Sequence, residues 1–155
     1  MANSNPSWIV KVPPPAWGVI FLAIAWLIGL ALPPAPADLT QLPFGIVLVI
    51  VGLAIAAPAV IAFRRAGTEI QPTSPSNRVL VVTGPFRSTR NPMYLGMLVM
   101  MIGIAFLIGS WPMLLAPLAF FILVNAVSMP FEEEKMARQF GDVYAAYKAR
   151  VRRWL

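Results

Sequence analysis

The sequence predicts an all-α membrane protein: four transmembrane helices in two hairpins, followed by an amphipathic cytoplasmic helix, all in one membrane domain over residues 1–155. Of the 155 residues, 59% are hydrophobic and only 12% are charged. Soluble domains usually carry about 25% charged residues, so most of this surface is expected to face lipid. The apolar residues are gathered into four long stretches, and the cations lie outside them.

The four apolar stretches are each long enough to cross a bilayer. They cover about residues 16–32, 44–63, 92–109 and 111–129. A hydrocarbon core about 30 Å thick needs roughly 20 helical residues, with about 17 as a lower limit. Because backbone groups in lipid must be satisfied within the segment, these stretches are expected to be helices. We expect the first to be retained, because it is longer than the apolar core of a cleaved signal peptide.

Prolines and glycines mark the ends of the predicted helices. Pro33-Pro34 ends the first helix, and Pro58 is expected to kink the second. Pro92 lies where a proline is favoured, just inside the third helix. The turn at 109–112, Gly-Ser-Trp-Pro, is so short that the third and fourth helices should form a close antiparallel pair.

Two polar segments flank the predicted second hairpin. The loop 64–91 contains RVLVVTG, a short β-branched run that predicts an extended segment. Pro130 is expected to end the fourth helix. Residues 131–153 then repeat apolar side chains at helical spacing, which predicts an amphipathic helix at the membrane surface. Gly141 interrupts this helix and is expected to bend it.

The net charge of +6 follows from membrane topology. Lys11 precedes the first apolar stretch, five arginines lie in the loop 64–91, and the other six cations follow the fourth stretch. The connections 33–43 and 109–111 carry neither Lys nor Arg. By the positive-inside rule both termini are cytoplasmic, and a bacterial cytoplasmic membrane is the expected location. No nucleic-acid partner is needed to explain the charge.

The chain has neither cysteine nor histidine. This excludes disulfides, thiolate nucleophiles and ordinary zinc sites, so no metal is expected. Any chemistry must use carboxylates, arginine, tyrosine, amides and backbone groups, or be supplied by a cofactor.

Three groups of polar residues are candidates for chemistry. Arg87, Arg90 and Asn91 lie where the third helix begins, and a helix N-terminus with arginines suits an anion. Juxtamembrane arginines also serve topology and headgroup contacts. The carboxylates at 132–134 can bind a ligand, or can simply offset the helix dipole. Asn125, deep in the fourth stretch, can line a substrate path or make an interhelical hydrogen bond.

Two motifs stand in order along the second half of the chain. TGPFRSTRNPMYLG at 83–96 is followed by a short helical hairpin and then by EE-x-x-M-x-x-x-F-G-x-x-Y-x-x-Y-x-x-x-V. The pair closely resembles the isoprenylcysteine carboxyl methyltransferase and phospholipid methyltransferase family of membrane enzymes. The resemblance covers roughly residues 70–154, and the first two apolar stretches match only in being hydrophobic.

The resemblance implies S-adenosylmethionine as the methyl donor, bound on the cytoplasmic side between the third and fourth helices and the C-terminal helix. It implies a lipid or lipid-like small molecule as the acceptor. The positions carried over for the cofactor are Gln71, Arg78, Val79, Leu80, Val81, Phe86, Asn91, Pro92, Tyr94 and Glu132. The expected catalytic positions are Arg90, Asn91, Tyr94 and Glu133, and the candidates on the substrate side are Asn125 and Ser128.

Two positions depart from the family pattern. Asn91 stands where many relatives have His, so it can form hydrogen bonds but cannot shuttle a proton near neutral pH. Ser128 stands where the eukaryotic prenylcysteine enzymes have an arginine implicated in substrate handling, so a prenylated-peptide carboxylate is not the expected substrate.

Two other functions remain open at this point. A small four-helix transporter would fit the length, although such carriers usually place a carboxylate inside the membrane and these stretches have none. An NADPH-dependent membrane reductase of the sterol-reductase type shares a similar C-terminal region, but such enzymes are generally much longer.

Overall fold

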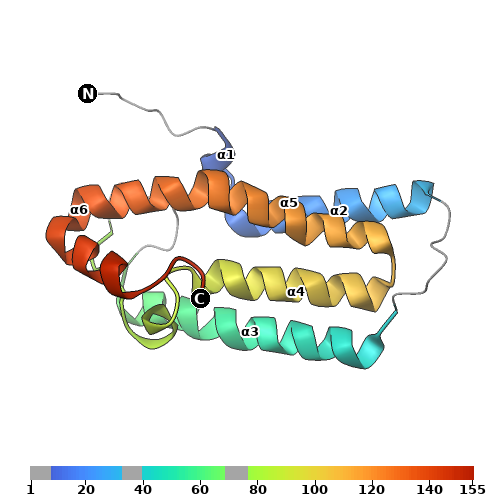
Figure 1. Ribbon diagram of the computed structural model, residues 1–155, viewed down its shortest axis with the longest axis horizontal. Coiled ribbons are helices and arrows are strands. Elements are labelled where there is room, and N and C mark those ends of the chain that lie inside the picture. The colour runs from blue at the N-terminus through green and yellow to red at the C-terminus, as the bar shows by residue number, and fades with distance from the viewer. Residues whose placement is uncertain (1–7, 33–39, 69–76) are drawn as a thin grey trace.

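The computed structural model describes residues 8–32, 40–68 and 77–155 (Figure 1). These residues form helices and connecting segments without a strand, which confirms the predicted all-α class. The elements are α1 (Trp8–Lys11), α2 (Pro14–Ala31), α3 (Leu42–Arg65), η1 (Gly84–Arg87), α4 (Pro92–Ile108), η2 (Trp111–Leu114), α5 (Leu115–Leu123), η3 (Val124–Ser128) and α6 (Met129–Arg150).

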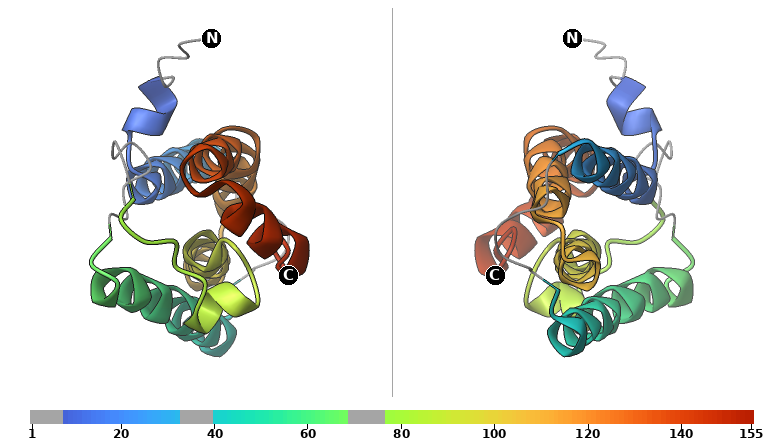
Figure 2. Two further views of the ribbon diagram at one scale, coloured as in Figure 1. Left: turned by 90° about the vertical axis from the view of Figure 1, so that its left-hand side faces the viewer. Right: turned by 90° about the vertical axis from the view of Figure 1, so that its right-hand side faces the viewer.

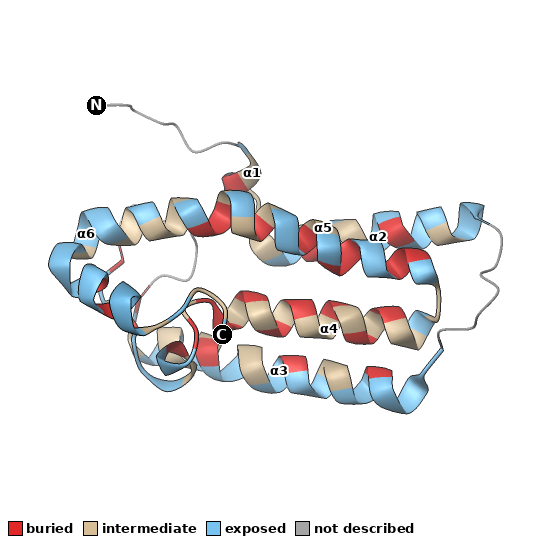
Figure 3. Ribbon diagram, viewed as in Figure 1, coloured by how far each residue is buried: buried red, intermediate tan, exposed pale blue. Residues whose placement is uncertain are grey.

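Three helical segments are long and apolar enough to cross a membrane: α2, α3 and the run Trp111–Arg150. The 17 residues of α4 form a shorter apolar helix. Large hydrophobic side chains cover the outward faces of α2 and α3, and most of these faces are exposed in Figure 3. Soluble proteins rarely expose apolar surface on this scale, whereas membrane proteins expose it to lipid. The chain therefore has the features of a multi-pass membrane protein.

The helices pair differently from the predicted two hairpins. α3 packs along the whole of α4, whereas α2 packs against α5 and η2 (Figure 1). Seen along the bundle, α2 and α3 lie on opposite sides of α4 (Figure 2). The first and second apolar stretches are therefore not a packed hairpin. The third and fourth stretches do lie side by side, and their facing side chains build the main core around Phe120 and Met101.

Glycines bring the backbones of α3 and α4 together. A Cβ placed on Gly52 would lie 2.5 Å from the carbonyl oxygen of Gly96, and one on Gly103 would lie 2.8 Å from that of Gly45. The glycines stand seven residues apart in each helix, so they recur on one side. Small residues of this kind allow close packing where no hydrophobic effect drives helices together in lipid.

The prediction that Pro130 ends the fourth helix is wrong. The helix continues through Pro130 from α5 into α6, and the π-helical turn η3 lies shortly before this proline. A proline within an α-helix clashes with the carbonyl four residues earlier. The wider π-helical turn relieves this crowding, so the fourth stretch and the predicted helix 131–153 form one continuous structure.

Gly141 bends α6, as predicted. Its φ of 49° and ψ of −124° are not helical, and a residue with a side chain rarely adopts this positive φ. The final part of α6 therefore turns back toward the bundle, and the C-terminus lies beside the start of α4 (Figure 1). This return brings the last residues to the same end of the bundle as the loop before α4.

The run RVLVVTG forms no strand within the described part of the loop. Thr83 is extended, with φ −106° and ψ 168°, and η1 follows it. Val81 and Phe86 are buried against Ala59 of α3, so this segment packs on the bundle through its side chains. Pro58 lies inside α3, which continues to Arg65.

We predict that Gly52→Ala destabilises the protein by about 2 kcal/mol, the usual scale of overpacking in a tight interface. The new methyl group would meet the backbone of α4, which has no space for it. Thermal unfolding of the purified protein in detergent measures the change. Gly18→Ala is the matched control, because its Cβ would lie 3.5 Å from the Met97 Cε, an ordinary contact. Equal melting temperatures for the two variants would contradict the prediction.

Candidate active site

A cavity of about 540 Å³ lies between the polar end of the bundle and its apolar middle. Its lining comes from α2, α3, α4, α6 and the segment before α4, so no single element forms it. Volumes of this order are typical of small-molecule sites. Nine of the residues proposed from the sequence line it: Val79, Leu80, Val81, Phe86, Arg90, Asn91, Tyr94, Glu132 and Glu133.

Two further residues proposed for the cofactor, Arg78 and Pro92, are not part of the cavity lining. Arg78 is outside the lining, and its backbone N–H donates to Thr68 Oγ1 at 3.0 Å. Pro92 is fully buried in the first turn of α4. Gln71 lies outside the described residues. The cofactor roles of these three residues stay predictions.

The two residues proposed on the substrate side are also outside the cavity lining. Asn125 Oδ1 accepts hydrogen bonds from Trp154 Nε1 at 3.3 Å and from Arg153 Nη1 at 3.4 Å. Ser128 is buried in η3. Asn125 thus contacts the non-helical segment that follows α6, and the substrate role of either residue stays a prediction.

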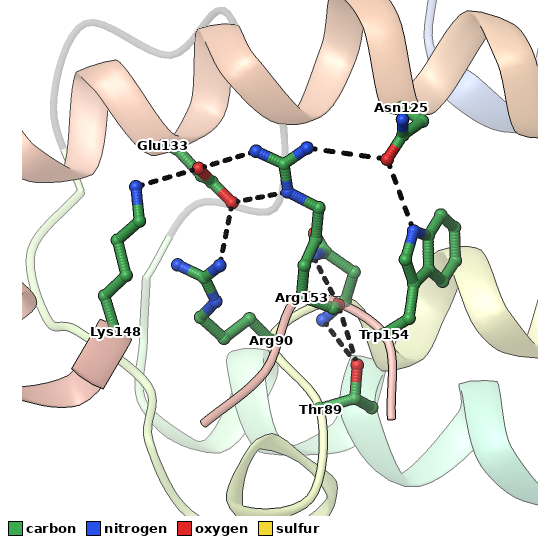
Figure 4. Close-up of polar contacts among 8 residues, drawn as sticks. Thr89, Arg90, Asn125, Glu133, Lys148, Arg153 and Trp154 are labelled. Atoms are coloured by element: carbon green, nitrogen blue, oxygen red, sulfur yellow. Dashed lines mark hydrogen bonds and ion pairs between the residues drawn. The ribbon is translucent and has the colours of Figure 1, made fainter. Parts of the chain in front are cut away.

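The carboxylate of Glu133 is bound by three cations (Figure 4). Arg153 forms a fork with it, Nε to Oε1 and Nη2 to Oε2, both at 2.9 Å. Arg90 Nη2 lies 3.2 Å from Oε1, and Lys148 Nζ lies 3.2 Å from Oε2. A planar guanidinium suits this two-point geometry, and such pairs are stronger than neutral hydrogen bonds.

The environment of Glu133 lowers its pKa. Partial burial alone would raise the pKa, but the hydrogen bond from Arg153 and the charge of Arg90 outweigh it, so the pKa falls below its ordinary value of 4.5. The carboxylate is consequently ionised at neutral pH, and it balances part of the positive charge around it.

The last residues of the chain fasten the segment before α4. The backbone N–H of Arg90 donates to the Arg152 carbonyl at 2.9 Å. The Arg153 carbonyl accepts from Thr89 Oγ1 at 3.0 Å and from Asn91 Nδ2 at 2.9 Å. We call residues 151–154 the C-terminal strap. The Asn91 amide group therefore holds this strap, although Asn91 also lines the cavity.

Glu132 points into the cavity beside Tyr94. The Tyr94 hydroxyl donates a hydrogen bond to Glu132 Oε1. Glu132 lies beyond Met129, where the apolar part of the helix ends. Burial raises the pKa of this carboxyl to about 7, and the hydrogen bond from Tyr94 and the charge of Lys135 offset part of the rise. A cationic ligand beside Glu132 would favour its ionised form.

Arg90 retains unused hydrogen-bonding capacity inside the cavity. Its side chain is only 10% exposed, and its Nε and Nη1 atoms are buried without a hydrogen-bond partner among the described residues. Buried donors of this kind carry a desolvation cost until a partner satisfies them. Arg90 is therefore suited to bind an anionic group, while Glu132 is suited to bind a cationic one. A ligand end that carries both charges matches the pair.

The inner part of the cavity is an apolar groove. Met97 and Met101 of α4 form part of its floor, and Gly18 of α2 and Val60 of α3 stand on its two sides. The groove follows from the helix pairing, because α2 and α3 pack on different partners. Methionine side chains adapt easily to an irregular apolar ligand.

Sequence reasoning missed several residues of the site. Arg153 and Lys148 were only counted among the cations that follow the fourth stretch, and α2 carried no motif. Tyr144 and Tyr147 belong to the second motif and line the cavity, and the Tyr147 hydroxyl donates to the Phe86 carbonyl at 2.8 Å. The two tyrosines, three residues apart, were a usable signal, because phenols on an apolar helix face normally have buried polar partners.

The fold and the site together define a helical membrane protein with a mixed polar and apolar pocket at one end of its bundle. The chain belongs to the phospholipid methyltransferase family, whose model matches residues 40–143. This membership identifies it as a membrane methyltransferase. An uncharacterised protein of Haemophilus influenzae is 33% identical over 63 residues, which are 41% of this chain and 100% of that protein. No solved structure matches the chain significantly.

We predict that Glu133→Gln lowers the free energy of unfolding by about 2 kcal/mol at neutral pH, because it removes the negative charge and one of the two acceptor oxygens that Arg153 and Arg90 share. A depressed pKa contributes stability above the unfolded value and loses it as pH falls through the folded value. The difference in melting temperature between wild type and variant should therefore shrink below about pH 4.5. Unfolding curves between pH 7 and pH 3 measure it, and a constant difference would refute this role.

Proposed function

We propose that the protein is an integral membrane methyltransferase that uses S-adenosylmethionine and methylates a lipid-like small molecule. The observation that carries the proposal is one continuous cavity with two kinds of lining. Its polar end holds Glu132 and Arg90, and its inner part is bounded by apolar side chains of α2, α3 and α4. A polar cofactor and a hydrophobic acceptor can therefore meet inside it.

The residues at the polar end fit the methyl donor. Its amino-acid end carries an ammonium and a carboxylate, which correspond to the carboxyl of Glu132 and the unpartnered nitrogens of Arg90. Phe86 and Val81 form a buried apolar surface beside them, which suits an aromatic base. The bound donor supplies an activated methyl group on a sulfonium.

The chain itself contributes alignment and a site shielded from water. Methyl transfer forms a bond between the acceptor nucleophile and the methyl carbon while the carbon–sulfur bond breaks, so precise placement lowers the barrier. A carboxylate acceptor needs no base. An acceptor that must lose a proton would additionally need a base in the cavity.

The acceptor proposal rests on the groove between α2 and α3. Its walls belong to α2 and α3, whose outward faces carry large exposed hydrophobic side chains, as expected for helices that cross a membrane. A hydrocarbon chain matches this lining. With both termini cytoplasmic, as the positive-inside rule predicts, the donor would enter from the cytoplasm. Family membership favours this function over a carrier or a sterol-type reductase.

We predict that Glu132→Gln weakens S-adenosylmethionine binding at least tenfold, measured by calorimetric titration of the protein in nanodiscs. Glu134→Gln is the matched control, because Glu134 is 56% exposed and pairs with Arg138 outside the cavity. It should bind as the wild type does. A well-folded wild-type sample that does not bind the donor would refute the proposed function.

The same titration should depend on pH. Because Glu132 has a pKa of about 7 and must be ionised to attract a cation, wild-type affinity is expected to fall as pH drops below 7 and to level off above it. Glu132→Gln should lose this dependence. An unchanged profile in the variant would assign the titration to another group.

We predict that Gly18→Leu slows methyl transfer to lipid acceptors more than tenfold while leaving donor affinity within twofold. The larger side chain would fill the groove beside Met97 and Met101, away from Glu132. Transfer from labelled donor to a lipid extract measures the first effect, and calorimetry measures the second. Gly18→Ala should keep most of the transfer. Loss of donor binding in Gly18→Leu would contradict a separate acceptor groove.

A further inference from the structure

We propose that Arg153 is a positioning residue of the donor site, and that it acts through Glu133 to keep the Arg90 guanidinium available to a ligand. This inference rests on the proposed function, because the ligand is the methyl donor. Arg153 lies outside the segment 40–143 that the family model matches, and it is outside the cavity lining.

The first argument is the way three cations share one carboxylate. Arg153 engages both oxygens of Glu133 at 2.9 Å, and Arg90 has a single contact with this carboxylate, at 3.2 Å. Two Arg90 nitrogens are left without partners in the described structure, and Arg90 lines the cavity. Without Arg153, both carboxylate oxygens of Glu133 would be free to accept from Arg90, whose planar guanidinium can form the same two-point contact. Arg90 would then be drawn into an internal ion pair.

The second argument is that the backbone of the same residue fixes the segment that carries Arg90. The Arg153 carbonyl accepts hydrogen bonds from the side chains on both sides of Arg90, those of Thr89 and Asn91 (Figure 4 shows the bond from Thr89). Its neighbour Trp154 is anchored on Asn125. The side chain of Arg153 and its carbonyl therefore act on Arg90 from two directions, one through charge and one through the backbone.

The third argument concerns charge. Arg153, Arg90 and Lys148 surround one carboxylate, which leaves an excess of positive charge at the polar end of the cavity. This positive charge can bind an anionic ligand group only through a side chain that lines the cavity. Arg90 does so, whereas Arg153 stays behind Glu133. Arg153 thus neutralises Glu133 without occupying the ligand's place.

The test compares Arg153→Gln with Arg152→Gln by calorimetric titration with S-adenosylmethionine. Both changes remove one positive charge from adjacent positions. Arg152 contacts the loop through its carbonyl alone in the interactions described, which the substitution retains. We expect about a tenfold loss of affinity for Arg153→Gln and a change within twofold for Arg152→Gln. Equal affinity of Arg153→Gln and wild type would overturn the proposal, even if the variant unfolds at a lower temperature.

A conservative variant covers the case in which Arg153→Gln does not fold. Arg153→Lys keeps the charge but cannot form the two-point contact, so we expect it to fold and to bind the donor about threefold more weakly than wild type. Wild-type affinity in Arg153→Lys would overturn the positioning role. Absence of donor binding in the folded wild type would instead refute the proposed function, and this inference with it.

A double-mutant comparison separates positioning from simple structural support. If Arg153 acts through Glu133, then Arg153→Gln should change donor affinity little in a Glu133→Gln background, because no carboxylate remains there to draw Arg90 away, so the two effects are far from additive. Losses of affinity that add fully would show that Arg153 acts independently of Glu133 and would overturn the proposal.

Discussion

The carboxylate of Glu133 connects three parts of the chain that are distant in sequence. It binds Arg90 before α4 and both Lys148 and Arg153 beyond the bend in α6. The side chains of Glu133 and Arg90 are only 12% and 10% exposed, so removing Glu133 leaves Arg90 as an incompletely paired buried charge. The polar end of the bundle therefore depends on this single acceptor. The loop, the strap and the cavity wall keep their relative positions because they share it.

The apolar part of the bundle has a different organisation, based on an uneven pairing of helices. Gly52 and Gly96 bring α3 and α4 into backbone contact, whereas α2 associates with α5 on the other side. A uniformly packed bundle would have left no room for a ligand. Because α3 packs closely on α4 while α2 packs on α5, α2 and α3 stand apart. The cavity lies between them.

The helices were predictable from the sequence because hydrophobic length alone decides what can cross a bilayer. The predicted hairpin of the first two stretches is not found, since lipid and helix neighbours are equally apolar, and only the glycines at 45, 52, 96 and 103 indicate that α3 packs on α4. Nine of the fourteen proposed site residues line the cavity, because both the segment before α4 and the start of α6 border it. Arg153 was missed because its approach to Glu133 depends on the return of the chain at Gly141, a tertiary event that helical spacing does not encode. The hydrogen bonds from Thr89 and Asn91 to the Arg153 carbonyl could not be predicted either, because every residue type has a backbone carbonyl.

The π-helical turn Val124–Ser128 changes the direction in which the side chains of α6 point. An α-helix advances by about 100° per residue, and a π-helical turn contains one residue more than an α-helical turn. The turn therefore rotates the rest of the helix relative to α5 by roughly that angle. Glu132 and Glu133, a few residues later, face the cavity in this rotated frame. A chain shortened by one residue within Val124–Ser128 could preserve every side chain of the motifs and still direct both carboxylates away from the pocket.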